Sequence, residues 1–113
     1  MLRSENRLKK RKEFNYIYRK GESFGNKYVT LYCSNTPKRV KKVGFSVSKK
    51  IGKAYERNKL KRQMRAIVRE QIPNMRENIA YIFVAKSGIE TLSFIELKDC
   101  ILNVLFKSGK LKK

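Results

Sequence analysis

The sequence has no histidine, a single aspartate and only two cysteines. Without histidine the chain lacks the usual general base, the hydrolase triads and most zinc sites. Asp99 has no second acid at metal-site spacing, so the chain offers no carboxylate cage for the magnesium ions of a protein nuclease. Cys33 and Cys100 lack a Cys-x-x-Cys spacing, which predicts buried thiols in a reducing compartment. Any hydrolysis that this chain supports must therefore be carried out by another molecule.

Long apolar runs and acidic residues are also scarce. No segment approaches the roughly 18 apolar residues that a membrane-spanning helix needs, and residues 2–12 are polar and basic rather than an apolar secretory signal. Nine acidic residues stand against 29 basic ones, which gives a net charge of +20 over 113 residues. Such a chain repels itself and attracts polyanions. These features predict a cytoplasmic nucleic-acid-binding protein, with an anionic membrane as the second candidate partner.

The densest group of cations lies in residues 57–65, with the sequence RNKLKRQMR. Only Glu56 adjoins this run, so its cations cannot serve mainly as partners of acids on the same helix. Most basic helix faces are simply solvated, but a row of unpaired cations is stabilised by a polyanion, and each arginine can hold a phosphate through two hydrogen bonds. At about 100° per residue, the helix places this cationic flank beside an apolar stripe made of Leu60, Met64, Ile67 and Val68.

The rest of the chain predicts an α+β sandwich in one RNA-binding domain, residues 1–113, with a flexible basic arm at 1–10 and a flexible basic tail at 107–113. Helices packed on a mainly antiparallel sheet fit the order of the elements, and a right-handed crossover would be usual at the basic helix. The expected elements are a helix at 12–20, a strand at 27–33 paired with a strand at 38–48, a central strand at 78–85 apolar on both faces, and a last helix after the capping box Ser93/Glu96.

One face of the predicted sheet has an unusual composition. Tyr28, Thr30 and Tyr32 alternate with core residues, where a solvent-facing strand more often carries charges. We expect the small residues Gly44, Ser46 and Ser48 of the partner strand to lie beside them. This face could then form a concave floor on which single-stranded bases stack. The plainer reading of Phe14 and Tyr18, on the preceding helix, is core packing.

Several motifs match a known pattern: RNKxKRxxR at 57–65, GFSVSKKIG at 44–52, NRLKK at 6–10 followed by Phe14, and the segment 26–32. Together they closely resemble the signature of the bacterial ribonuclease P protein subunit, which works with a catalytic RNA to remove 5′ leaders from precursor tRNA. The resemblance covers most of residues 6–86. Lys59 departs from it, because many members carry a second arginine there, and lysine keeps the charge but loses the fork.

The resemblance implies the order αβββαβα with a left-handed crossover at the basic helix. It also implies a catalytic RNA and precursor tRNA as partners, with no DNA, membrane or small-molecule substrate, and Mg2+ held mainly by the RNA. No protein residue would be catalytic, and whether the protein itself binds metal stays open. The expected contacts to the catalytic RNA are Arg57, Asn58, Lys59, Lys61, Arg62 and Arg65, and those of the leader cleft are Phe14, Tyr18, Tyr28, Tyr32, Ser46, Ser48, Lys49 and Lys50.

Two alternatives remain at this point. A small basic ribosomal protein, or another structural RNA-binding protein without a role in cleavage, would share the charge and the basic tails but would not need the aromatic floor. A cationic membrane-active protein would need a long amphipathic helix with an aromatic lipid-facing side, and the cation-rich helix has none.

Overall fold

The computed structural model describes residues 11–36 and 41–111, and within them it has the predicted order αβββαβα. The expected arm, residues 1–10, and residues 112–113 lie outside the described part. Lys107 and Ser108, which we assigned to the tail, belong to the last helix. The elements are α1 (Arg11–Lys20), β1 (Glu22–Gly25), β2 (Val29–Asn35), β3 (Lys41–Ser46), α2 (Ala54–Gln71), β4 (Ile79–Ala85) and α3 (Phe94–Ser108), with 3-10 turns η2 (Lys49–Ile51), η3 (Ile72–Asn74) and η4 (Ile89–Thr91).

The four strands form one sheet in the order β1-β2-β4-β3. The β1–β2 and β2–β4 pairs are antiparallel and the β3–β4 pair is parallel, so the sheet is mainly antiparallel as predicted. The prediction that segment 38–48 pairs with segment 27–33 is wrong, because β4 lies between them. β4 is buried on both faces, and an apolar strand gains most from the central position, whereas β3 with Lys41, Lys42 and Gly44 tolerates the edge.

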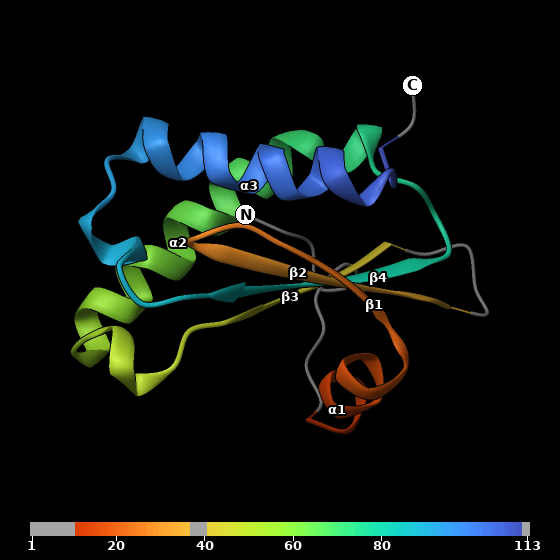
Figure 1. Cartoon of the computed structure of the whole chain (residues 1–113), viewed down its shortest axis with the longest axis horizontal. Helices are drawn as coiled ribbons and strands as arrows, with labels where there is room; N and C mark the ends of the chain where they lie inside the picture. The colour runs from red at the N-terminus through yellow and green to blue at the C-terminus, as the bar shows by residue number, and fades with distance from the viewer. Residues whose placement is uncertain (1–10, 37–40, 112–113) are drawn as a thin grey trace.

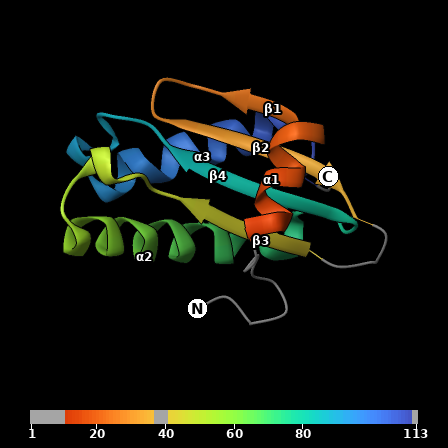
Figure 2. The same cartoon turned by 90° about the horizontal axis from the view of Figure 1, so that it is seen from below.

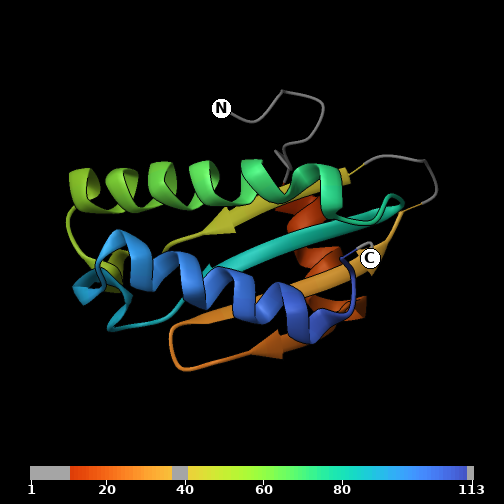
Figure 3. The ribbon, with the colours of Figure 1, turned by 90° about the horizontal axis from the view of Figure 1, so that it is seen from above.

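The connection from β3 through α2 to β4 is left-handed. Figure 3 looks at the sheet from the helix side: β3 and β4 both point left, α2 returns to the right in front of them, and β4 lies below β3. With α2 on this face, a right-handed return would place β4 on the far side of β3, where it could not pair with β2. The crossover implied by the resemblance is therefore present, and the common right-handed one is not.

The helices cover the two faces of the sheet unequally (Figure 1). α2 and α3 lie side by side on one face, over the larger buried cluster, which includes Leu31, Met64, Tyr81, Phe83 and Ile101. α1 crosses the other face alone, over a small cluster of Ile17, Ala80 and Ile82. Of the side chains in the described residues, those beneath α2 and α3 supply most of the core, and the face under α1 keeps uncovered area.

The ends of α3 follow their sequence signals. The N–H of Glu96 donates to Ser93 Oγ at 3.2 Å, and the N–H of Ser93 donates to Glu96 Oε1 at 2.8 Å, which is the predicted capping box. Gly109 closes the helix in the left-handed conformation, with φ 68°. These caps fix both ends of α3 beside α2.

Candidate nucleic-acid interface

α2 separates its apolar stripe from its cations as predicted. Leu60, Met64, Ile67 and Val68 are all buried against the core. The side of α2 that carries Glu70 faces α3, because Glu70 lies 3.8 Å from Lys98 Nζ. At helical spacing the cationic flank therefore faces away from α3, beside the free edge at β3 (Figure 3).

The cations of this flank have no acidic partner within residues 11–36 and 41–111. Arg57, Lys61 and Arg65 recur every four residues and are half-buried, while Asn58 and Arg62 lie farther out and are exposed. The two ion pairs found among the described residues, Lys98–Glu70 and Lys110–Glu22, do not involve them. The adjacent Glu56 instead accepts the backbone N–H of Lys53 at 2.8 Å, at the start of α2. The positive charge of this flank is thus left for an external anion.

Two arginines of the flank each have a buried side-chain donor. The Nε atoms of Arg57 and Arg65 are buried and have no hydrogen-bond partner among the described residues. A buried donor without an acceptor costs on the order of 1 to 3 kcal/mol, and such groups need an explanation in a folded protein. Binding of an anion by these two guanidinium groups would offset this cost.

Lys59 does not join the flank, although it was expected among the RNA contacts. It lines a separate hollow of about 250 Å³ on the side of α2 toward η4, together with Tyr55, Gln63 and Glu90. The reason is helical geometry, since residue 59 is about 200° around the helix from residues 57 and 61.

Phe14, Tyr18 and Tyr32 form one aromatic cluster on the other face of the sheet. The ring centroids of Phe14 and Tyr18 are 6.3 Å apart, and those of Tyr18 and Tyr32 are 5.0 Å apart in an edge-to-face arrangement. Phe14 and Tyr32 also pack against the small buried cluster. These rings therefore serve partly as core, as the plainer reading held, yet Tyr18 keeps 37% of its surface exposed.

The floor beside this cluster differs from the one predicted. Gly44 and Ser46 are not neighbours of Tyr32, because β4 intervenes, and the register gives the row Thr30–Val84–Ser46 across β2, β4 and β3. All three are half-buried, and α1 covers only part of this face (Figure 2). Val84 is absent from the predicted floor, because its incomplete burial within an otherwise buried strand could not be read from its apolar neighbours.

The end of β3 continues this surface. Ser48, Lys49 and Lys50 follow Ser46 and are exposed, the two lysines within η2 just before α2. Along this side of the sheet the aromatic cluster lies under α1, the row Thr30–Val84–Ser46 crosses the sheet beside it, and the two lysines lie beyond the end of β3. We call these residues the α1-face surface: Phe14, Tyr18, Thr30, Tyr32, Val84, Ser46, Ser48, Lys49 and Lys50.

The prediction that Tyr28 shares this face with Tyr32 is wrong. Tyr28 packs against the larger cluster, on the α3 side of the sheet, close to Gly88. Strand alternation begins only at Val29, because Asn26 Oδ1 accepts the backbone N–H groups of Tyr28 and Val29 and holds residues 26–29 in a turn. Tyr28 therefore contributes to the core rather than to the α1-face surface.

Within the described residues, no group of three His, Cys, Asp or Glu side chains is placed to hold a metal ion. Cys33 is buried as predicted, and burial raises its pKa to about 12, so the thiol stays protonated at neutral pH. Cys100 is half-buried, and burial likewise raises its pKa. No helix of the described part has the length and apolar character to cross a membrane.

Comparison with known proteins points in one direction. The family model described as Ribonuclease P matches residues 2–109. The ribonuclease P protein component of Streptococcus pneumoniae is 36% identical over 99 residues, which cover 88% of this chain and 80% of that protein. The RNase P protein of Staphylococcus aureus superposes with a TM-score of 0.89 at 28% identity, covering 95% of this chain and 98% of that one. The protein from Thermotoga maritima gives a TM-score of 0.82 at 27% identity, covering 89% and 96%.

Proposed function

The chain belongs to the ribonuclease P protein family, and we propose that its two surfaces serve the two RNAs of that enzyme. Ribonuclease P is an endoribonuclease that removes the 5′ leader from precursor tRNA, and this chain is its protein subunit. The RNA subunit carries the bond cleavage, which leaves a 5′-phosphate on the mature tRNA. The protein contributes binding rather than chemistry.

The cationic flank of α2 is the surface that we assign to the catalytic RNA. A row of cations with no acidic partner in the described part of the chain suits a folded phosphate backbone, which presents anions at many spacings but little readable sequence. Arg57, Lys61 and Arg65 form the inner row, with Asn58 and Arg62 outside it. Lys59, on the other side of α2, has at most a peripheral role.

The α1-face surface is the one that we assign to the leader. Its exposed aromatic edge can stack single-stranded bases, and Lys49 and Lys50 can guide the backbone. Contacts to a leader that mature tRNA lacks favour substrate over product. The observation that carries this assignment is the Phe14–Tyr18–Tyr32 cluster beside a partly uncovered sheet face.

We place the Mg2+ of the reaction mainly on the RNA subunit. Mg2+ prefers several oxygen ligands, and among the described residues no group of three His, Cys, Asp or Glu side chains is placed to hold a metal ion. The cations of the protein could still help, because they offset repulsion in the crowded RNA backbone that holds the metal. A cytoplasmic site of action, with precursor tRNA, belongs to the same proposal.

Arg65→Ala should weaken assembly with the catalytic RNA by about 1 to 3 kcal/mol, the value of a single charged hydrogen bond to phosphate. The free protein should melt no lower than the parent, because the substitution removes a buried donor that has no partner. Filter binding to the RNA subunit and a thermal melt test the two parts. Arg76→Ala, an exposed arginine outside α2, is the matched control. A variant that melts lower and assembles normally would make Arg65 a structural residue.

Tyr18→Ala should leave assembly nearly unchanged and weaken binding of precursor tRNA by about 1 to 3 kcal/mol if a base stacks on the ring. The measurement is the ratio of affinities for precursor tRNA with a leader of several nucleotides and for mature tRNA. Tyr55→Ala, at an exposed tyrosine of α2, is the control. If the well-folded Tyr18 variant keeps the full parental preference for the leader, the aromatic cluster is core only.

A further inference from the structure

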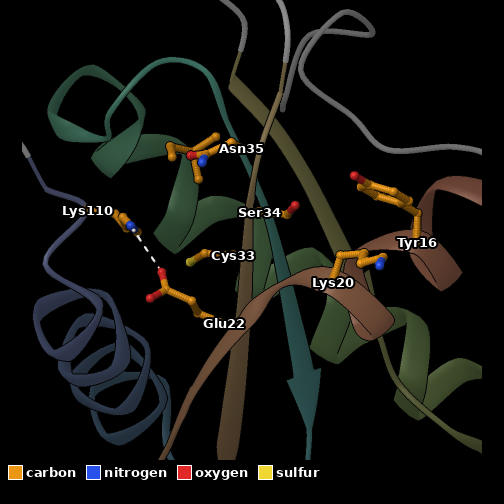
Figure 4. Close-up of a pocket in the computed structure, with 8 residues that line it drawn as sticks. Tyr16, Lys20, Glu22, Cys33, Ser34, Asn35 and Lys110 are labelled. Atoms are coloured by element: carbon orange, nitrogen blue, oxygen red, sulfur yellow. Dashed lines mark ion pairs between the residues drawn. The ribbon is translucent and has the colours of Figure 1, made fainter.

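A second polar hollow lies on the opposite flank of α1 from Phe14 and Tyr18. It has a volume of about 300 Å³ and lies where β2 runs past the start of β1. The ladder between these strands ends at the Glu22–Cys33 pair, so β1 does not cover Ser34 and Asn35. The lining residues are Tyr16, Lys20, Glu22, Cys33, Ser34, Asn35, Ile79 and Lys110 (Figure 4).

Backbone contacts position the two walls of this hollow. At the end of α1 the N–H of Gly21 donates to the carbonyl of Ile17 at 2.8 Å. A Cβ on Gly21 would lie 2.6 Å from the carbonyl oxygen of Cys33, so only glycine lets α1 approach β2 this closely. This contact fixes Tyr16 and Lys20 beside Ser34. On the other wall, the carbonyl of Lys110 accepts the N–H of Arg76 at 2.9 Å, and the Lys110 side chain is only 23% exposed.

The charges in the hollow are of both signs. Lys110 Nζ lies 3.3 Å from Glu22 Oε1, and that carboxylate is 67% exposed. Figure 4 places this ion pair on one side of β2 and Ser34, Lys20 and Tyr16 on the other. Lys20 and Lys110 together exceed the single carboxylate by one positive charge. Tyr16, a residue that is 52% exposed, presents its ring at the rim as a stacking surface.

From this arrangement we infer that the hollow binds one ribonucleotide of a single-stranded RNA segment. The base stacks on Tyr16, the phosphate is held by Lys20 on the same wall, and on the opposite wall the Glu22 carboxylate, held by Lys110, accepts a hydrogen bond from the ribose 2′-hydroxyl. An aromatic ring beside cations is the usual means of holding single-stranded nucleic acid, and an acceptor for the 2′-hydroxyl distinguishes RNA from DNA. The volume suits one nucleotide and no more. This inference assumes the RNA-binding role proposed above, but it concerns a site apart from the α1-face surface.

The test is a titration of the 15N-labelled full chain, followed by NMR, with adenosine 5′-monophosphate, its 2′-deoxy analogue, inorganic phosphate and a short single-stranded RNA. The ribonucleotide and the RNA should shift the amides of Gly21, Ser34 and Asn35, and the deoxy analogue and phosphate should bind several-fold more weakly. Tyr16→Ala and Lys20→Gln should each weaken binding of the ribonucleotide by about five- to tenfold. Lys12→Gln, an exposed lysine of the same helix, should have less than about a twofold effect.

The outcomes separate this site from the α1-face surface. Shifts confined to Thr30, Tyr32 and Val84 would overturn the inference and leave the leader assignment standing. Equal affinity for phosphate and ribonucleotide would overturn the role of Tyr16, and equal affinity for the deoxy analogue would overturn that of Glu22. If Tyr18→Ala abolishes leader preference while shifts at Gly21, Ser34 and Asn35 persist, both sites stand independently.

Discussion

RNA-free protein should leave precursor tRNA uncut at every magnesium concentration, and cleavage should appear only when the RNA subunit is added. The expected contrast is complete, because the chain has no histidine to act as a general base, and among the described residues no group of three His, Cys, Asp or Glu side chains is placed to hold a metal ion. The assay follows 5′-labelled precursor tRNA under multiple turnover, with protein, RNA subunit and both together.

The control for a contaminating nuclease is the set of variants Asp99→Asn, Glu70→Gln and Glu77→Gln, made one at a time. None of these should alter the rate of the reconstituted enzyme by more than about twofold, since a surface charge is worth little. Turnover by RNA-free protein that is lost on replacing one of these acids would mean that the protein carries its own catalytic centre.

Local patterns in the sequence predicted the helices well. The spacing of Leu60, Met64, Ile67 and Val68 places these residues on one stripe, and all four are buried. The capping box at Ser93 likewise forms, because it depends on residues only three apart. Such features depend on neighbours in the chain, and the sequence contains those directly.

The pairing of the strands and the handedness of the crossover depend on residues that are distant in the sequence. Proximity in the sequence predicts that segments 27–33 and 38–48 pair, but β4 takes the place beside β2 because it buries both of its faces. The position of β4 between β2 and β3 also makes the crossover left-handed. It separates Gly44 from Tyr32 and places Val84 between Thr30 and Ser46. The errors in the predicted floor thus share one cause. The prediction for Tyr28 is wrong for a local reason. The turn at Asn26 delays the start of strand alternation to Val29.

The layers explain how one small protein could contact two RNAs. α2 and α3 lie on one face of the sheet and α1 on the other, so the cationic flank and the α1-face surface point in different directions (Figures 1 and 2). They meet at η2, where Lys49 and Lys50 link the end of β3 to the start of α2. An RNA on each side would therefore approach the other near these two lysines.

Assembly of the protein with the RNA subunit should depend steeply on salt. Because the net charge is +20 and the cations of the α2 flank have no acidic partners in the described structure, binding should release counterions from several phosphates. A slope of log affinity against log salt of roughly −4 to −8 is expected, so a fourfold rise in salt should weaken assembly by roughly 10²- to 10⁵-fold. Filter binding over a salt series, with pH and magnesium held constant, measures this slope.

Single variants should show which residues contribute to this salt dependence. Arg62→Ala or Arg65→Ala should make the slope shallower by about 0.9 for each phosphate that the variant no longer neutralises, whereas Arg76→Ala should leave it unchanged. Tyr18→Ala should change the affinity for leader-bearing substrate without changing its slope, because base stacking releases few counterions. A slope near zero for the parent would mean that assembly depends on apolar contacts. A slope that Arg76→Ala reduces as much as Arg65→Ala would mean that net charge alone, rather than the α2 flank, attracts the RNA.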